Sequence, residues 1–226
     1  MKKVHEAIWK DLLPVSSAFT TAEVAAAADV HVANASRDLA LLADRGLVVR
    51  IRRGLWVAPG HPEFSPYAVV PHLFDDPGGT DQAYVSVVSA LSLHGMLDQI
   101  PRTIHVVVRR QRHSLPTPFG TYEFHRVSKM LFGGYEPYGR TAAFLLATPE
   151  KALFDTLYLS TRKGRRFAHL PEVELPSGFS STLVEGWISR IEHERTATAV
   201  RRRWIEFSTA SSSAPPPALA IPEGLP

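Results

Sequence analysis

Apolar side chains in the first part of the chain recur at helical spacing. Over residues 4–13 they fall at Val4, Ile8 and Leu12, on one face of an amphipathic helix. A second helix is expected over residues 20–28, where a threonine able to cap a helix precedes an alanine-rich stretch of strong helix formers. The pattern therefore predicts two short helices in succession.

A third helix is expected over residues 32–44. Its side chains Ala35, Leu39 and Leu42 are spaced to point at one core, and a tight turn at residues 29–31 separates it from the second helix. Two helices joined by a short turn, with another helix before them, are typical of a helix-turn-helix.

A β-hairpin is expected directly after the third helix. Two β-prone runs, residues 47–51 and 55–58, flank a short turn that ends in Gly54. The order helix, helix, helix, hairpin predicts a winged helix-turn-helix over residues 1–58. Residues 59–83 begin with a proline-rich stretch, which suits a linker and entry segment because helices and central strands tolerate proline poorly.

The rest of the chain mixes helical and strand patterns. Residues 84–207 are predicted to form a larger α+β domain, so that the fold class of the whole chain is α+β. Residues 208–226 are rich in serine, alanine and proline, and a flexible tail is expected there. The expected helices cover residues 84–94, 149–160, 182–193 and 196–207, and the expected strands cover residues 104–108 and 119–127.

Composition narrows the class of protein. The chain has 226 residues, enough for a small domain and a larger one, and it contains no cysteine, which excludes disulfides and thiolate-bound metals. Its longest apolar run, residues 142–147, is far shorter than the ~20 residues that a membrane-spanning helix needs. With no signal peptide visible, we expect a cytoplasmic protein without a membrane partner.

Basic residues gather in clusters, although the net charge is only +3. The first cluster, residues 45–53, has no acidic residue and coincides with the predicted wing. Small and polar side chains on the outward face of the third helix could approach base edges, while wing arginines could contact phosphates. Ordinary solvated surface is the alternative for each cluster. The candidate DNA-binding residues are His31, Asn34, Ser36, Arg37, Arg50, Arg52 and Arg53.

Catalytic motifs are weak. There is no glycine-rich phosphate-binding loop, and Glu150 and Asp155 lie five residues apart, away from a shared helix face. The histidines show no metal-ligand spacing, so His105, His113 and His125 are interpreted as ordinary strand and loop residues. We therefore expect no enzyme activity, no metal and no cofactor.

Four stretches give the chain a resemblance to the AbiEi family of antitoxins, which belong to bacterial toxin–antitoxin systems. The resemblance covers roughly residues 5–207, and its most specific part combines the wing turn with the Thr-Pro-Glu-Lys-Ala-Leu-Phe-Asp helix. The four stretches are residues 53–57, 84–95, 147–155 and 170–176.

The resemblance implies a protein that represses its own operon by binding inverted repeats, while its second domain counters a nucleotidyltransferase toxin. Cations could recognise a toxin site that handles phosphates and acidic metal ligands. The candidate partner-binding residues are Arg109, Arg110, Arg112, Arg162, Lys163, Arg165 and Arg166. Two alternatives stay open: a stand-alone winged-helix regulator with a ligand-sensing second domain, and a nuclease directed to DNA by the winged helix.

Overall fold

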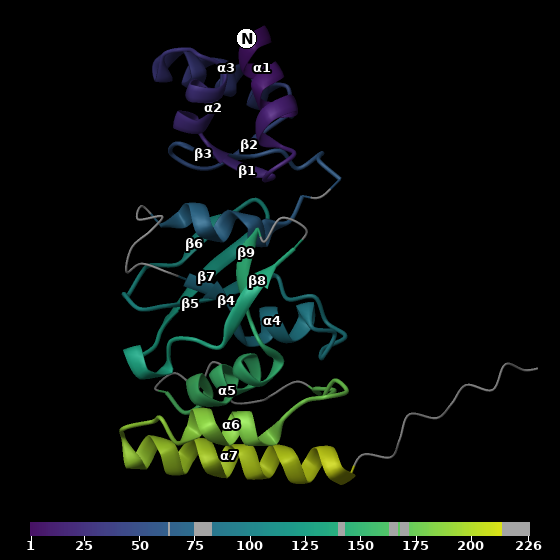
Figure 1. Ribbon diagram of the computed structural model, residues 1–226, viewed down its shortest axis with the longest axis vertical. Coiled ribbons are helices and arrows are strands. Elements are labelled where there is room, and N and C mark those ends of the chain that lie inside the picture. Colours follow the sequence, from purple (N-terminus) through teal and green to yellow (C-terminus); the bar gives the residue numbers. More distant parts are fainter. Residues whose placement is uncertain (63, 75–82, 140–142, 163–166, 168–171, 214–226) are drawn as a thin grey trace, which may run out of the picture.

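The protein is a mixed α+β fold built of two stacked units (Figure 1). The first unit is formed by residues 1–58 and the second by the described residues from 64 onward. The computed structural model describes residues 1–62, 64–74, 83–139, 143–162, 167 and 172–213.

The first unit contains the three predicted helical segments and the predicted hairpin. A short strand before the second helix was not predicted. The elements are α1 (Lys2–Ala7), which continues into the π-helical turn η1 (Ile8–Leu12), then β1 (Ala18–Thr20), α2 (Thr21–Ala27), α3 (Val32–Asp44), β2 (Val49–Arg52) and β3 (Leu55–Val57).

Local hydrogen bonds fix where α2 and α3 begin. Thr20 and Glu23 form a capping box, in which the Thr20 hydroxyl accepts from the Glu23 amide and the Glu23 carboxylate accepts from the Thr20 amide. At the start of α3 the His31 Nδ1 accepts from the Ala33 amide at 3.3 Å. The turn between the helices places Asp29 at a φ of 50°, a left-handed conformation that aspartate tolerates better than most residues.

The sheet of the first unit is covered on both faces. Its strands lie in the order β1-β3-β2, and all neighbours are antiparallel. Phe19 and Trp56 pack into the core formed with the helices, whereas Ala18, Leu55 and Val57 join the core of the second unit. Because successive side chains of a strand point to opposite faces, this three-stranded sheet contributes side chains to the cores of both units.

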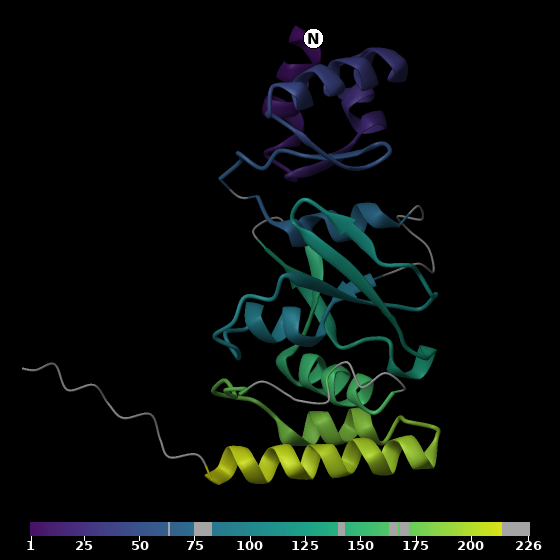
Figure 2. The ribbon, with the colours of Figure 1, turned by 180° about the vertical axis from the view of Figure 1, so that it is seen from behind.

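The second unit is built on a six-stranded mixed sheet with the strand order β6-β7-β5-β4-β9-β8. Helices α5, α6 and α7 stack beyond the sheet, on the side away from the first unit (Figure 1 and Figure 2). The elements are η2 (Pro66–Leu73), β4 (Ala83–Val85), α4 (Val87–Leu93), β5 (Thr103–Val108), β6 (Leu115–Thr117), β7 (Gly120–Arg126), η3 (Lys129–Leu131), β8 (Tyr135–Tyr138), β9 (Phe144–Ala147), α5 (Pro149–Ser160), α6 (Ser181–Ile188) and α7 (Glu194–Ser213).

Several sequence predictions for this half are correct and others need correction. The predicted strands correspond to β5 and β7, and α5 has the predicted bounds. The helix predicted over residues 84–94 was wrong at its start, because Tyr84 and Val85 pair with β5 and β9 as the strand β4. The short strands β6, β8 and β9 were not predicted.

The segments on either side of the second unit also differ from expectation. Within the predicted linker, η2 is a 3₁₀ helix whose Val69, Val70 and Leu73 are buried in the core of the second unit. Helix α7 runs to Ser213, beyond the start of the predicted tail, and residues 214–226 lie outside the described residues. Among the helices of the described residues, none is long and apolar enough to cross a membrane.

Candidate nucleic-acid interface

The outward face of α3 carries the side chains predicted to meet DNA. His31, Asn34, Ser36 and Arg37 are all exposed, and 72% of the Arg37 side chain is accessible. The side chains predicted to face inward, Ala35, Leu39 and Leu42, are buried. The predicted DNA-facing side chains of the helix therefore point outward, while its predicted core side chains remain buried.

A buried acid in α3 was missed by the sequence analysis. Asp38 is 6% exposed and forms an ion pair with the amino group of Met1. Its other oxygen lies 3.8 Å from the Arg37 Nε. Asp38 thus ties the start of α1 to α3 next to Arg37, the one arginine of that helix.

The three arginines of the hairpin point in different directions. Arg50 is exposed, with its guanidinium 5.5 Å from the centre of the Trp56 ring, and Arg53 is exposed at the turn. Arg52 instead reaches the second unit, where its Nη2 donates to the His72 carbonyl at 3.0 Å. The three arginines therefore do not converge on one surface.

A β-bulge in β2 explains the direction of Arg52. Arg50 pairs with Trp56 and Arg52 pairs with Leu55, so Ile51 is an extra residue in the strand. Without the bulge, Arg50 and Arg52 would share a face of the sheet, as residues two apart normally do. With it, Arg52 lies on the same side as Leu55, which packs against the second unit.

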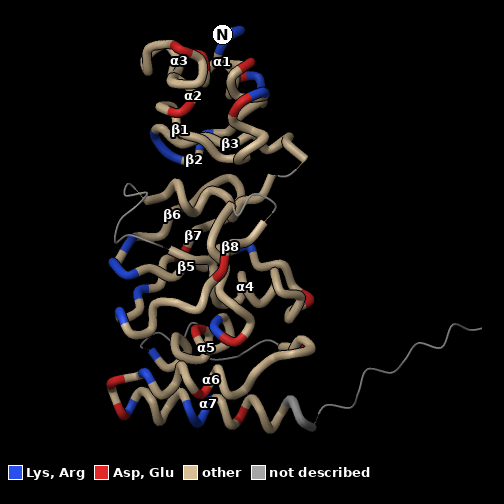
Figure 3. Tube along the Cα trace, in the orientation of Figure 1, with Lys and Arg blue, Asp and Glu red and all other residues tan. Residues whose placement is uncertain are grey.

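Other exposed arginines of the first unit belong to α3, to its C-terminal end and to the hairpin. Helix α3 and the turn between β2 and β3 extend toward the same side of the unit in both views (Figure 1 and Figure 2). Basic residues of β2 also lie on that side (Figure 3). The exposed arginines of α3, of its C-cap and of the hairpin are Arg37, Arg45, Arg50 and Arg53.

A second basic region lies at the ends of β5 and β7. These strands are parallel and pair Val108 with Arg126, so the Arg109 to Arg112 stretch begins beside Arg126. Arg162, at the end of α5, donates to the Arg126 carbonyl at 2.6 Å. Two predicted partner-binding stretches that are far apart in sequence are therefore brought together, with Arg126 as an added member.

Two arginines of this region are held against aromatic rings. Arg112 lies 4.5 Å from the centre of the Phe74 ring, and Arg162 lies 4.8 Å from that of Tyr158. Arg110 is exposed and Arg109 is half-buried. The predicted residues Lys163, Arg165 and Arg166 lie outside the described residues.

The helix of the Thr-Pro-Glu-Lys-Ala-Leu-Phe-Asp motif carries a buried ion pair rather than a carboxylate pair. Lys151 and Asp155 are fully buried and bonded to each other, and Asp155 also accepts from the Ser86 hydroxyl at 2.8 Å and the Tyr84 hydroxyl at 3.1 Å. The Lys151 Nζ lies 4.6 Å from the centre of the Trp187 ring. Burial lowers the pKa of Lys151, against the opposing effect of Asp155, and burial raises the pKa of Tyr84. Because these groups have no access to solvent, we assign them a structural role.

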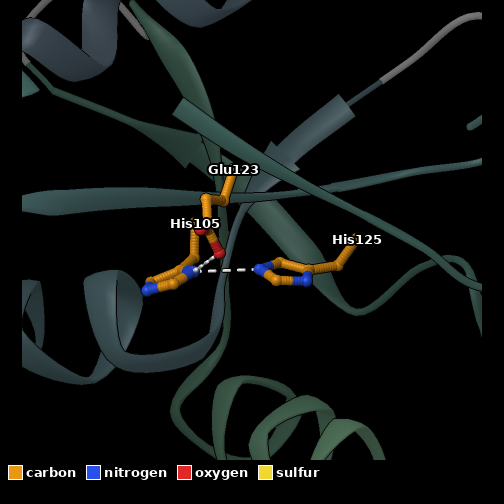
Figure 4. Close-up of side chains that lie close together, drawn as sticks. All are labelled: His105, Glu123 and His125. Atoms are coloured by element: carbon orange, nitrogen blue, oxygen red, sulfur yellow. Dashed lines mark hydrogen bonds and ion pairs between the residues drawn. The ribbon is translucent and has the colours of Figure 1, made fainter. Parts of the chain in front are cut away.

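The structure also places two histidines and a glutamate together, which the sequence analysis did not foresee. His105 on β5 lies beside Glu123 and His125 on β7 (Figure 4). The His105 Nδ1 and the His125 Nε2 are 2.9 Å apart, and the Glu123 Oε2 is 3.9 Å from the His105 Nδ1. The parallel register of the two strands could have indicated this cluster, but that register was not predictable from local pattern.

No family model matches the chain, and no curated protein matches it. Inference about function therefore rests on the side chains and their geometry.

Proposed function

We propose that residues 1–58 form a winged helix-turn-helix that binds duplex DNA. The observation that carries this proposal is the order of elements α1-β1-α2-α3-β2-β3 with an outward α3 face of small and polar side chains next to exposed arginines. In such modules the helix after the turn enters the major groove and the hairpin contacts the backbone beside it.

The proposed contacts differ between α3 and the hairpin. Arg37, Asn34 and His31 are suited to base edges or to the phosphates that flank them. Arg50 and Arg53 are suited to phosphates, and each contact releases about one counterion on binding. Arg52 is not part of the proposed interface, because its guanidinium donates a hydrogen bond to the second unit.

Binding to the DNA upstream of the chain's own gene tests this proposal. Replacing Arg37 with Ala should relax sequence preference at a cost of ~1–3 kcal/mol if the side chain reads a base. Replacing Arg53 with Ala should weaken binding to every sequence and lower the salt slope by about one unit. Fluorescence anisotropy at several salt concentrations, with specific and random duplexes, measures both effects.

Two matched arginine variants serve as controls. Arg52→Ala should leave the salt slope unchanged, since this side chain faces the second unit, and Arg195→Ala changes an exposed arginine of α7 in the second unit. Equal losses of slope in the Arg52, Arg53 and Arg195 variants would reject the proposed surface.

We further propose that the protein is a cytoplasmic antitoxin that represses its own operon at inverted repeats and counters a nucleotidyltransferase toxin. The resemblance of its motifs to the AbiEi family supports this. So does the gathering of Arg109, Arg110, Arg126 and Arg162 at one end of the second unit's sheet. A basic surface of this kind is complementary to a partner site lined with acidic metal ligands.

Co-expression with the neighbouring gene tests the antitoxin proposal. The chain should restore growth when that gene is toxic, and a variant with Arg109→Glu and Arg110→Glu should lose the rescue while keeping DNA binding. Failure of the unaltered chain to rescue growth would favour a stand-alone regulator. Full rescue by the variant would remove this basic region from the proposal.

A further inference from the structure

The pairing of β5 with β7 builds a compact group of metal-ligand side chains in the second unit. The parallel register sets His105 opposite Glu123 and Val107 opposite His125. Because residues two apart on a strand share a face, Glu123 and His125 point to the same side. Figure 4 shows the His105 and His125 rings facing each other, with the Glu123 carboxylate reaching toward the space between them. One nitrogen from each histidine and one oxygen from Glu123 all lie within 4.8 Å of one another.

The separations within the group approach those around a bound transition metal. Ligand atoms at ~2.0–2.1 Å from a tetrahedral zinc ion lie about 3.3 Å apart. The two nitrogens are 2.9 Å apart, and the nearer glutamate oxygen is 3.9 Å from the His105 nitrogen. The remaining separation, between His125 and Glu123, is no more than 4.8 Å. Small movements of the side chains would therefore bring all three atoms to the spacing around one ion.

The surroundings favour a pre-arranged site with one accessible side. His105 and His125 are 7% and 8% exposed, and both rings meet the ring of Phe167 edge to face. The Glu123 side chain is 28% exposed, so the site can be reached from its side. Buried imidazoles held between strands lose little rotational freedom when they bind an ion, which favours affinity.

From this geometry we propose that His105, Glu123 and His125 bind one zinc ion, with the fourth position open to water or an external ligand. Two imidazoles and one carboxylate are a donor set that zinc accepts in sites with an open position. Magnesium and calcium prefer all-oxygen ligands, and the two histidines make them poor occupants. The ion replaces the direct contact between the two rings and links β5 to β7.

Zinc binding to the folded chain is expected to raise its thermal stability. An ion that binds the folded state and not the unfolded one shifts the folding equilibrium by mass action. The shift should saturate at one zinc per chain, because the three side chains form a single site. This inference is independent of the proposed DNA binding.

Titration of the full-length, metal-stripped chain with zinc tests the proposal. Competition against a chromophoric chelator should show one zinc bound per chain, and thermal melts should rise by several degrees. His125→Gln and Glu123→Gln should each weaken binding at least about tenfold, since even the residues that only orient zinc ligands change affinity by about 10–100-fold. Cobalt(II) in place of zinc should give the intense visible absorption of a four-coordinate site.

His113→Gln is the matched control, because His113 is an exposed histidine in the loop after β5. It should bind zinc like the unaltered chain. The proposal is overturned if the unaltered chain binds no stoichiometric zinc, or if the His125 and Glu123 variants bind as tightly as the His113 variant. Because the Glu123 side chain is only partly buried, the Glu123→Gln chain should fold even if a histidine variant does not. Weakened zinc binding by this folded chain would support the proposal, and undiminished binding would overturn it.

Discussion

At the scale of single residues, Lys151 and Asp155 form the most deeply buried charged contact among the described residues. Both side chains have an exposed fraction of 0%. Taking two charges out of water is costly, and here the cost is offset by their mutual bond, by two hydroxyl donors to Asp155 and by the rings around Lys151. The Thr-Pro-Glu-Lys-Ala-Leu-Phe-Asp motif therefore has a physical role in holding α5 to β4.

Breaking this pair should destabilise the protein strongly. Asp155→Asn leaves the Lys151 cation buried without its counter-charge, and a loss of about 3–5 kcal/mol in the free energy of unfolding is expected. Urea unfolding followed by circular dichroism measures it. Glu206→Gln removes one partner of the exposed Arg202–Glu206 pair and should cost far less. Similar losses in the two variants would contradict the structural role assigned to Lys151 and Asp155.

Two buried tyrosines should make the protein sensitive to alkali. Burial raises the pKa of Tyr84 and of Tyr122 above the ordinary value of 10.0. Above that pH the unfolded chain loses phenolic protons that the folded chain retains, so the stability from these groups is complete below pH ~10 and falls as pH rises further. Each tyrosine contributes up to about 1.4 kcal/mol per pH unit to this slope.

Comparison of Tyr122→Phe with the unaltered chain isolates one tyrosine. The variant also loses the hydrogen bond from the Tyr122 hydroxyl to the Pro66 carbonyl, which lowers stability at every pH. Its unfolding free energy should nevertheless decline less steeply between pH 10 and about pH 11.5. Tyr138→Phe, the same change at an exposed position, is the control. Parallel pH curves for the Tyr122 variant and the unaltered chain would refute the assignment.

At the scale of elements, the backbone φ at a glycine determines whether its replacement by alanine stabilises or destabilises the protein. Gly54 ends the turn of the β2–β3 hairpin at a φ of 80°, which side-chain-bearing residues adopt only with strain. Gly186 lies inside α6 with no left-handed φ, and nothing lies within 4 Å of a Cβ added there. The two positions are therefore open to the same substitution and differ in backbone geometry.

The change to alanine should have opposite effects at these two positions. Gly54→Ala should lower the unfolding free energy by about 1–2 kcal/mol, the cost of a left-handed non-glycine residue. Gly186→Ala should raise it by about 0.5–1 kcal/mol, because alanine restricts the unfolded chain and favours helix. Chemical denaturation of both variants measures the two shifts, and effects of the same sign would show that φ is not the deciding factor.

At the scale of the whole molecule, the sheet of the first unit is part of the second unit's core. Leu55 and Val57 belong to the same core cluster as Val69 and Val70 of η2, while Trp56 between them joins the core formed with the helices. Arg52 adds a polar contact across the same boundary. The position of α3 relative to the second unit is therefore set by packing as well as by the connecting chain.

This arrangement predicts that the two units unfold together. Calorimetry should show a single transition, and Leu55→Ala should lower the stability of the whole chain by about 2–5 kcal/mol because it opens a cavity at the boundary. Leu183→Ala, at an exposed position of α6, is the control and should have little effect. Two separate transitions, with only one of them moved by Leu55→Ala, would show that the units are independent.

The sequence by itself determined the elements with strong local signals. The helices of the first unit, its hairpin, the strands β5 and β7, and the bounds of α5 all follow from periodicity, caps and turn residues. These signals depend on residues a few positions apart, so they can be recognised without knowing the rest of the fold. The inward and outward faces of α3 were predictable for the same reason.

Tertiary structure alone decided the pairing of strands and the directions that depend on it. The bulge at Ile51 turned Arg52 toward the second unit, and the parallel register of β5 and β7 brought His105 to Glu123 and His125. Register is fixed by packing across the whole sheet, and a shift of one residue moves every side chain to the other face. No local pattern in the chain carries that information, which is why the histidine cluster and the direction of Arg52 emerged only from the folded molecule.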